Sequence, residues 1–276
     1  MKKILILIGM FVVFGIAFFY YQQRNEVYNE IISPLSESME EMGFLKKNNT
    51  SPVGSAIDTV LDSRKGSSGH AIYYKDIKTG ETYEKNAQKQ FQAASLYKLW
   101  IMGEVFHQID EGKLKKEDIL KDSVENLNKR FNIASESAEK KEGEVELSVE
   151  DGLEKMITIS DNYAALLLSS KVRLSNVTNF LKRYGLTHSS IGVPPKTTAH
   201  DTGIFFDKIY KGEIVGQLYS KEMQSILRRQ KLNDRLPKYL PEPVLVAHKT
   251  GELDGFKHDG GIIYAPKGPY ILVVLS

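Results

Sequence analysis

Strand-like patterns occur at the two ends of residues 53–276, and helical patterns fill the middle. After a short helix over 53–61, the alternation predicts strands over 70–77 and 81–84, joined by the turn Lys78-Thr79-Gly80. Helices are predicted over 95–111, 149–171, 174–184 and 198–211, and further strands over 244–249, 261–264 and 270–275. This order predicts an α+β fold whose sheet is built from the two ends of this region.

The composition excludes several classes of protein. The 276 residues allow one or two domains, and 41% hydrophobic with 26% charged residues is ordinary globular usage. The formal net charge of +2 gives no reason to expect a nucleic-acid partner. With no cysteine, the chain has no disulfide, no thiolate metal site and no cysteine nucleophile, and it can fold in either redox compartment.

The N-terminus predicts export. Lys2 and Lys3 precede an uncharged, mostly apolar run from Ile4 to Tyr21, which is close to the shortest length that spans a bilayer. We favour an uncleaved membrane anchor over 1–21, with the remainder outside the cell membrane. The alternative is a signal segment cleaved near Gly15-Ile16-Ala17, which would give a secreted or periplasmic protein. Residues 22–52 are predicted to be a stalk or linker ahead of the domain.

Ser95-Leu96-Tyr97-Lys98 opens a predicted helix and carries possible nucleophilic chemistry. A lysine three residues after a serine lies on the same helix face, where it would act as base for the weakly nucleophilic hydroxyl. Burial would lower the pKa of this lysine and suit it for that role. The pattern alone is weak, because Ser137-Ala138-Glu139-Lys140 also fits it within a charged run that we predict to be a solvated surface segment.

Two further motifs follow in order. Ser160-Asp161-Asn162 interrupts a helical stretch. The alternative to a role in a functional site is that the triplet is a simple helix cap. His248-Lys249-Thr250-Gly251 ends a predicted strand, where a cation and a hydroxyl would meet a substrate carboxylate and the glycine would permit close approach. The same Lys-Thr-Gly triplet at residue 78 is explained by a hairpin turn.

The three motifs together are far more specific than any one of them. In this order they resemble class A β-lactamases and penicillin-binding proteins, over about residues 53–276. The resemblance implies an antiparallel sheet flanked by helices and an all-helical subdomain over about 96–200. It also implies a helix after the last strand; because the sequence stops at Ser276, we expect this helix to be absent here, or the sequence to be a fragment.

The resemblance also implies roles for individual residues. Ser95 would be the acylated nucleophile and Lys98 its base, while Ser160 and Lys249 would pass a proton to the leaving nitrogen. The substrate-binding residues would be Asn162, Thr250, Gly251 and Glu252. The backbone N–H groups of Ser95 and Glu252 would form the oxyanion hole. No cofactor and no metal are implied, and the histidines show no metal-ligand spacing.

The sequence departs from the class A pattern in the loop before the third motif. Class A enzymes carry there a glutamate that activates the deacylating water. Residues 184–196 contain no Asp or Glu, and the nearest acid, Asp201, falls in the next predicted helix. His188 would be a substitute base, although a solvated loop histidine is the simpler interpretation. Glu252 is a second departure, because it adds a carboxylate to a site that attracts anions.

Three functions remain open at this stage. We favour an exported serine hydrolase that β-lactams acylate at Ser95 and that opens the β-lactam ring. The alternatives are a D-Ala-D-Ala carboxypeptidase or transpeptidase of the penicillin-binding type, and a sensor that is acylated without turnover. The expected partners are a small β-lactam or a peptidoglycan stem peptide, and the membrane through the N-terminal segment. We expect a monomer.

Overall fold

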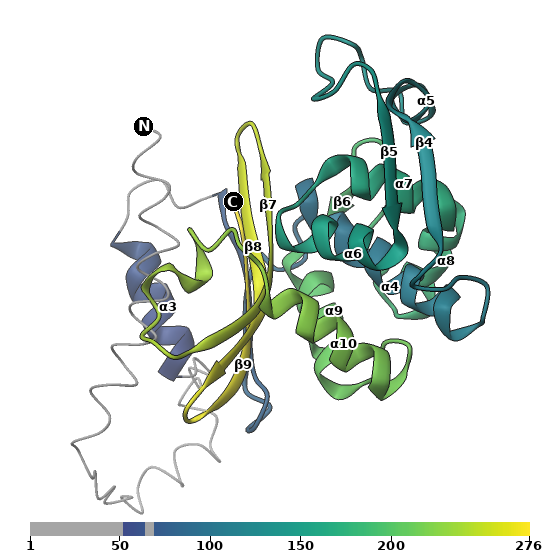
Figure 1. The fold of residues 1–276 in the computed structure, drawn as a ribbon. Helices are drawn as coiled ribbons and strands as arrows, with labels where there is room; N and C mark the ends of the chain where they lie inside the picture. Colours follow the sequence, from purple (N-terminus) through teal and green to yellow (C-terminus); the bar gives the residue numbers. More distant parts are fainter. Residues whose placement is uncertain (1–51, 64–68) are drawn as a thin grey trace, which may run out of the picture. The chain divides into compact units, whose positions relative to one another are not determined.

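The computed structural model describes residues 52–63 and 69–276 (Figure 1). The predicted anchor and nearly all of the predicted stalk lie outside these residues. Within the described part of the chain, no helix has the length and apolar character needed to cross a membrane. The first described element is α3 (Pro52–Asp62), which confirms the helix predicted over 53–61. Its Val53, Ile57 and Leu61 are buried at helical spacing.

A five-stranded sheet joins the two ends of the remaining chain, as predicted (Figure 1). Its strands are β1 (Ala71–Asp76), β2 (Thr82–Lys85), β7 (Leu245–Leu253), β8 (Phe256–Ala265) and β9 (Gly268–Leu275). The order is β2-β1-β9-β8-β7, and every neighbouring pair is antiparallel. β7 and β8 extend beyond the predicted strands because they pair from Leu245 with Tyr264 to Leu253 with Phe256.

Helices follow the predicted order between the strands. They are α4 (Lys98–Asp110), α5 (Val124–Arg130), α6 (Val149–Thr158), α7 (Asn162–Val172), α8 (Leu174–Arg183), α9 (Ala199–Lys211) and α10 (Gly216–Arg228). The short 3-10 helices η2 (Ala94–Tyr97) and η3 (Leu236–Tyr239) precede α4 and β7. α5 and α10 were not predicted. α4 is buried along most of its length, including Trp100, so it is a central element of the helical part.

Two small sheets complete the described chain. β3 (Phe91–Gln92) pairs with β6 (Lys196–Thr197), and β4 (Ile119–Ser123) pairs with β5 (Glu144–Ser148). The second strand pair corrects the expectation that the charged run from Ser135 to Glu146 is entirely a solvated segment. Its end enters β5, where Val145 is buried. Val145 and Leu147 alternate with Glu144 and Glu146 there, a short strand pattern at the end of a run dominated by charge.

α9 packs closely against β1. A Cβ added to Gly203 of α9 would lie 2.2 Å from the Tyr73 ring of β1, so only glycine permits this approach. Lys75 of β1 donates to Asp207 of α9 at 2.9 Å, and Lys211 donates to the same carboxylate oxygen at 2.7 Å. The sheet and the helical layer are therefore joined by both close packing and a partly buried ion pair.

Candidate active site

Ser95 lies in η2, directly ahead of the buried helix α4. The preceding residue, Ala94, has a φ of 45°, and Ala93 N–H donates to Pro195 O at 2.8 Å. Left-handed backbone at a non-glycine residue is costly and is retained where the surroundings require it. Ser95 is partly exposed, and among the described residues none forms a hydrogen bond with its hydroxyl. The hydroxyl is thus accessible to a ligand.

Lys98 begins α4 and is completely buried. Its Nζ donates to Ser160 O at 2.6 Å, to Asn162 Oδ1 at 2.7 Å and to Ser160 Oγ at 3.1 Å. Burial lowers the pKa of Lys98 to about 8, while the nearby carboxylates of Asp161 and Glu139 act in the opposite direction. At pH 7 roughly a tenth of Lys98 is therefore unprotonated and able to accept a proton, and this fraction rises as the pH approaches 8.

Ser160 and Asn162 flank the junction of α6 and α7. Asp161 caps α7, its side chain accepting from Ala164 N at 2.7 Å. Ser160 has a φ of 60°, which turns the chain so that both Ser160 and Asn162 contact Lys98. Asp161 is therefore the helix cap, while Ser160 and Asn162 on either side of it lie against Lys98.

Lys249 approaches the same serine from the sheet. Its buried Nζ donates to Ser160 Oγ at 3.0 Å and to Thr250 O at 2.9 Å. Burial, reinforced by the positive charge of Lys98, lowers the pKa of Lys249 well below its ordinary value. Ser160 thus lies between two lysines with weakened affinity for protons, an arrangement suited to moving a proton through its hydroxyl.

Gly251 allows strand β7 to contact η2. A Cβ at Gly251 would lie 3.1 Å from Ala93 O and 3.2 Å from Ala94 Cβ. The sequence predicts that this glycine leaves room for a substrate; the structure adds that it lets the Lys249 strand approach the Ser95 helix. Thr250 is buried and Glu252 is exposed on the same strand.

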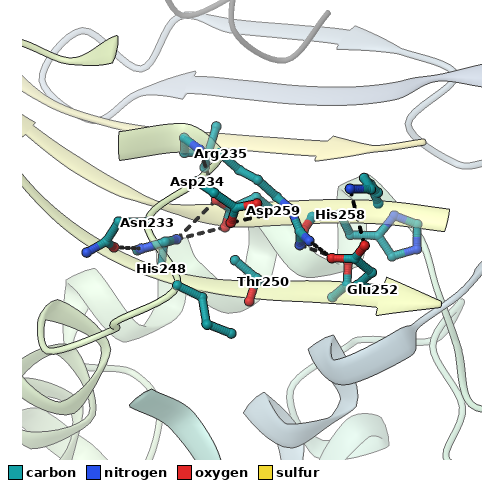
Figure 2. A network of polar contacts seen from close by, with 12 residues as sticks. Asn233, Asp234, Arg235, His248, Thr250, Glu252, His258 and Asp259 are labelled. Atoms are coloured by element: carbon teal, nitrogen blue, oxygen red, sulfur yellow. Dashed lines mark hydrogen bonds and ion pairs between the residues drawn. The ribbon is translucent and has the colours of Figure 1, made fainter. Parts of the chain in front are cut away.

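Arg235 is a site residue that sequence reasoning missed. It lies just before η3, and Figure 2 shows its guanidinium between Asp259 and Glu252. Its Nη1 donates to Gly251 O at 3.1 Å and to His258 O at 2.9 Å, and its Nη2 donates to Glu252. No local motif marks this position. Glu252 also forms an ion pair with Lys257 at 3.2 Å. Arg235 and Lys257 therefore both balance the negative charge of Glu252, the residue that departs from the class A pattern.

A buried polar network supports β7 next to Thr250 (Figure 2). His248 Nδ1 lies 2.9 Å from Asp259 Oδ1, and His248 Nε2 lies 3.0 Å from Asn233 Oδ1. Because a carboxylate oxygen can only accept a hydrogen bond, the hydrogen between His248 and Asp259 lies on His248 Nδ1. Asp259 also accepts from Leu236 N at 3.0 Å. The network fixes the start of η3 to the sheet and thereby positions Arg235.

The loop over 184–196 supplies no carboxylate, and Asp201 does not replace one. Asp201 lies in the first turn of α9, in the helix predicted there, and Thr198 caps that helix. Its buried carboxylate accepts from His188 N at 2.9 Å and from Ser189 Oγ at 2.8 Å, so it holds the loop. The His188 side chain is 54% exposed, and within the described structure it forms no hydrogen bond with Ser95 or Lys98. The solvated-histidine interpretation fits this geometry.

Glu139 is the second residue that sequence reasoning missed. Its carboxylate accepts a hydrogen bond from Asn162 Nδ2, on the side of that amide opposite Lys98. The residue lies in the charged run, inside the second serine-lysine pattern at residues 137–140. That pattern is a surface loop with no catalytic geometry of its own, yet it delivers a carboxylate to the edge of the site.

Comparisons with known proteins agree with this geometry. A family model described as the beta-lactamase enzyme family matches residues 52–276. A search of curated proteins found no match. Among solved structures, a beta-lactamase from Sphaerobacter thermophilus is 23% identical with a TM-score of 0.68, covering 79% of this chain and 86% of that one.

Two further structures show the same fold. PBP-A is 22% identical with a TM-score of 0.67, covering 79% of this chain and 85% of that one. The TLA-1 extended spectrum beta-lactamase is 21% identical with a TM-score of 0.65, covering 80% and 87%. A mutant of PBP-A, similar to this chain with a TM-score of 0.68, was solved as an acyl-enzyme complex with penicillin G.

Proposed function

Because the chain belongs to the beta-lactamase enzyme family, we propose that it is an exported active-site serine hydrolase, acylated at Ser95 by β-lactams, that opens the β-lactam ring. The observation that carries the proposal is the position of Ser160 Oγ, within 3.1 Å of Lys98 Nζ and 3.0 Å of Lys249 Nζ. Lys98 follows the accessible Ser95 by one helical turn. The apolar run over 1–21 supports export.

The proposed acylation follows from these contacts. Unprotonated Lys98 takes the proton of Ser95 Oγ as this oxygen bonds to the β-lactam carbonyl carbon. The ring C–N bond then breaks, Ser160 gives its proton to the leaving nitrogen, and Lys98 returns a proton to Ser160. Lys249 favours negative charge near Ser160 and Thr250, where a substrate carboxylate would bind. The Ser95 and Glu252 N–H groups would hold the oxyanion.

Deacylation is the step that the described residues support least. A water molecule attacking the acyl-enzyme needs a positioned base, and Asp201 is occupied with His188 and Ser189 instead. We therefore expect deacylation, rather than acylation, to limit turnover. The same observation favours a second candidate function, a D-Ala-D-Ala carboxypeptidase or transpeptidase of the penicillin-binding type.

Intact-mass measurements test the proposal. The full-length protein is mixed with benzylpenicillin and followed over time, with Ser95→Ala as the negative variant. Ser137→Ala is the matched control, because Ser137 belongs to the second serine-lysine pattern. A Ser95-dependent adduct that clears while penicilloate accumulates would establish a β-lactamase. A persistent adduct, with release of D-Ala from a stem-peptide mimic, would establish the peptidase, and the absence of adduct, penicilloate and D-Ala release would reject both.

A further inference from the structure

Glu139 is held against Asn162 by a fixed loop. Tyr163 Oη donates to Lys140 O at 2.8 Å and accepts from Lys140 N at 3.1 Å. Asn128 Nδ2 donates to the same Lys140 carbonyl at 2.9 Å. These contacts anchor the residue that follows Glu139, so the carboxylate lies at Asn162 as part of the folded structure.

The Glu139 carboxylate has no cationic partner in the described part of the chain. The neighbouring Lys140 instead places its Nζ over the Tyr163 ring, 5.2 Å from the ring centre. Glu139 is exposed, and its negative charge raises the pKa of Lys98, against the larger effect of burial. Burial raises the pKa of Tyr97 to about 12, and Glu139 adds to this effect. An unbalanced carboxylate beside a substrate-binding amide is open to a cation from a ligand.

The geometry of Asn162 indicates which part of a ligand would meet this carboxylate. The amide nitrogen has two hydrogens, and Glu139 accepts one of them. In the proposed function the other donates to the carbonyl of the substrate's side-chain amide. The carbon attached to that carbonyl then lies next to Glu139, so a charged group on this carbon interacts with the carboxylate directly.

We propose that Glu139 is a specificity-determining residue, which favours substrates with an ammonium group beside the amide held by Asn162 and disfavours those with a carboxylate there. The inference rests on the proposed function, because it takes the substrate's orientation from it. The chemical class is an acylated amine whose acyl α-carbon carries an ammonium group, as in an aminopenicillin or an amino-acyl peptide.

Three penicillins that differ at this one carbon test the proposal. Ampicillin carries an ammonium group, benzylpenicillin a hydrogen and carbenicillin a carboxylate. Second-order acylation rate constants are measured by intact mass at about pH 6.5, where an α-amino group is mostly protonated. Glu139→Gln is compared with wild type, and Glu136→Gln is the matched control, because Glu136 is exposed in the same loop and forms no hydrogen bond to Asn162 in the described structure.

In wild type we expect ampicillin to react fastest and carbenicillin slowest. Glu139→Gln should reduce the ampicillin-to-carbenicillin ratio about fivefold to tenfold while benzylpenicillin changes less than about twofold. Glu136→Gln should leave the ratio unchanged. High salt should lower the ratio in wild type and not in Glu139→Gln, because an exposed charge is screened.

Other outcomes overturn the proposal. An unchanged ratio in Glu139→Gln would show that the carboxylate does not contact the substrate. An equal loss for all three penicillins would show that Glu139 only orients Asn162. If wild type forms no adduct with any of them, the proposed acylation is wrong. In that case, calorimetry measures the affinity of the three penicillins for Ser95→Ala and for the double variant that also carries Glu139→Gln. If the two variants bind each penicillin equally well, the proposed role of Glu139 is rejected.

Discussion

Lys98 and Lys249 contact the same hydroxyl from opposite parts of the fold, one from helix α4 and the other from strand β7. Ser160 has one hydroxyl proton, so it can donate to only one of the two amines at a time. Burial lowers the pKa of both lysines, in Lys98 to about 8. Small changes in pH therefore decide how many protons this group of three residues carries.

The rate of acylation should rise with pH through about 8 and then level off. Below its lowered pKa, Lys98 is an ammonium group and cannot accept the proton of Ser95, so the rate falls as pH falls; above that pKa the base is fully available. The measurement is the rate constant of adduct formation with benzylpenicillin from about pH 6 to 10, with the melting temperature followed in parallel. A rate that is flat, or that falls between pH 7 and 9 while the protein stays folded, would contradict this assignment.

Lys98→Arg should reduce acylation by about 10²–10⁴-fold and remove its rise near pH 8. Arginine keeps the positive charge but remains protonated, so it cannot act as the base. Lys140→Arg, in the second serine-lysine pattern, is the matched control and should acylate at the wild-type rate. An active Lys98→Arg enzyme would show that another group takes the proton.

Arg235→Met should destabilise the domain by about 1–3 kcal/mol. The substitution leaves the carbonyls of Gly251 and His258 without the donor that they share. Urea unfolding measures the change. Glu252→Gln is the comparison, and it should cost less than about 1 kcal/mol because the Glu252 side chain is 54% exposed. Equal losses in the two variants would mean that the ion pair, rather than the carbonyl contacts, holds this loop.

Asp207→Asn should destabilise the protein by about 1–3 kcal/mol at neutral pH and weaken its acid sensitivity. Burial alone would raise the pKa of Asp207, but hydrogen bonds from Lys211 and Lys75 outweigh it and hold the pKa below its ordinary value. The stabilisation is therefore present above the unfolded carboxyl pKa of about 3.9 and is lost as pH falls through the lower folded value. Thermal unfolding between about pH 3 and 7 should show a smaller pH dependence in the variant. An identical dependence would assign the acid sensitivity to other carboxylates.

Much of the fold was predictable because its signals are local. Alternation located β1, the apolar residues 270–275 located β9, and Thr198 and Gly212 mark the two ends of α9 by capping. The three motifs also identified the residues that surround Ser160. These predictions succeed where a residue's role is set by its neighbours in the sequence.

The predictions fail where partners are distant in the chain. Glu139 was assigned to a solvated run, and its place at the site depends on Asn162, which is 23 residues away. Arg235 contacts strand residues from a loop without a motif, and its role appears only when β7 and β8 pair. α10 was missed as an element, although it contacts β7 in the folded protein. No periodicity or spacing reports contacts of this kind.

The pairing of β1 with β9 has a consequence for how the chain is made. β9 lies between β1 and β8, so the first hairpin of the sheet gains its neighbour only when the last strand has been synthesised. Loop closure over such a separation is slow, and until then β1 lacks the strand that pairs with one of its edges. Tyr73 and Val273 meet across this pair in the finished sheet. We therefore expect ribosome-bound chains that end before Gly268 to be protease-sensitive and to need chaperone protection, with resistance acquired abruptly once β9 is released.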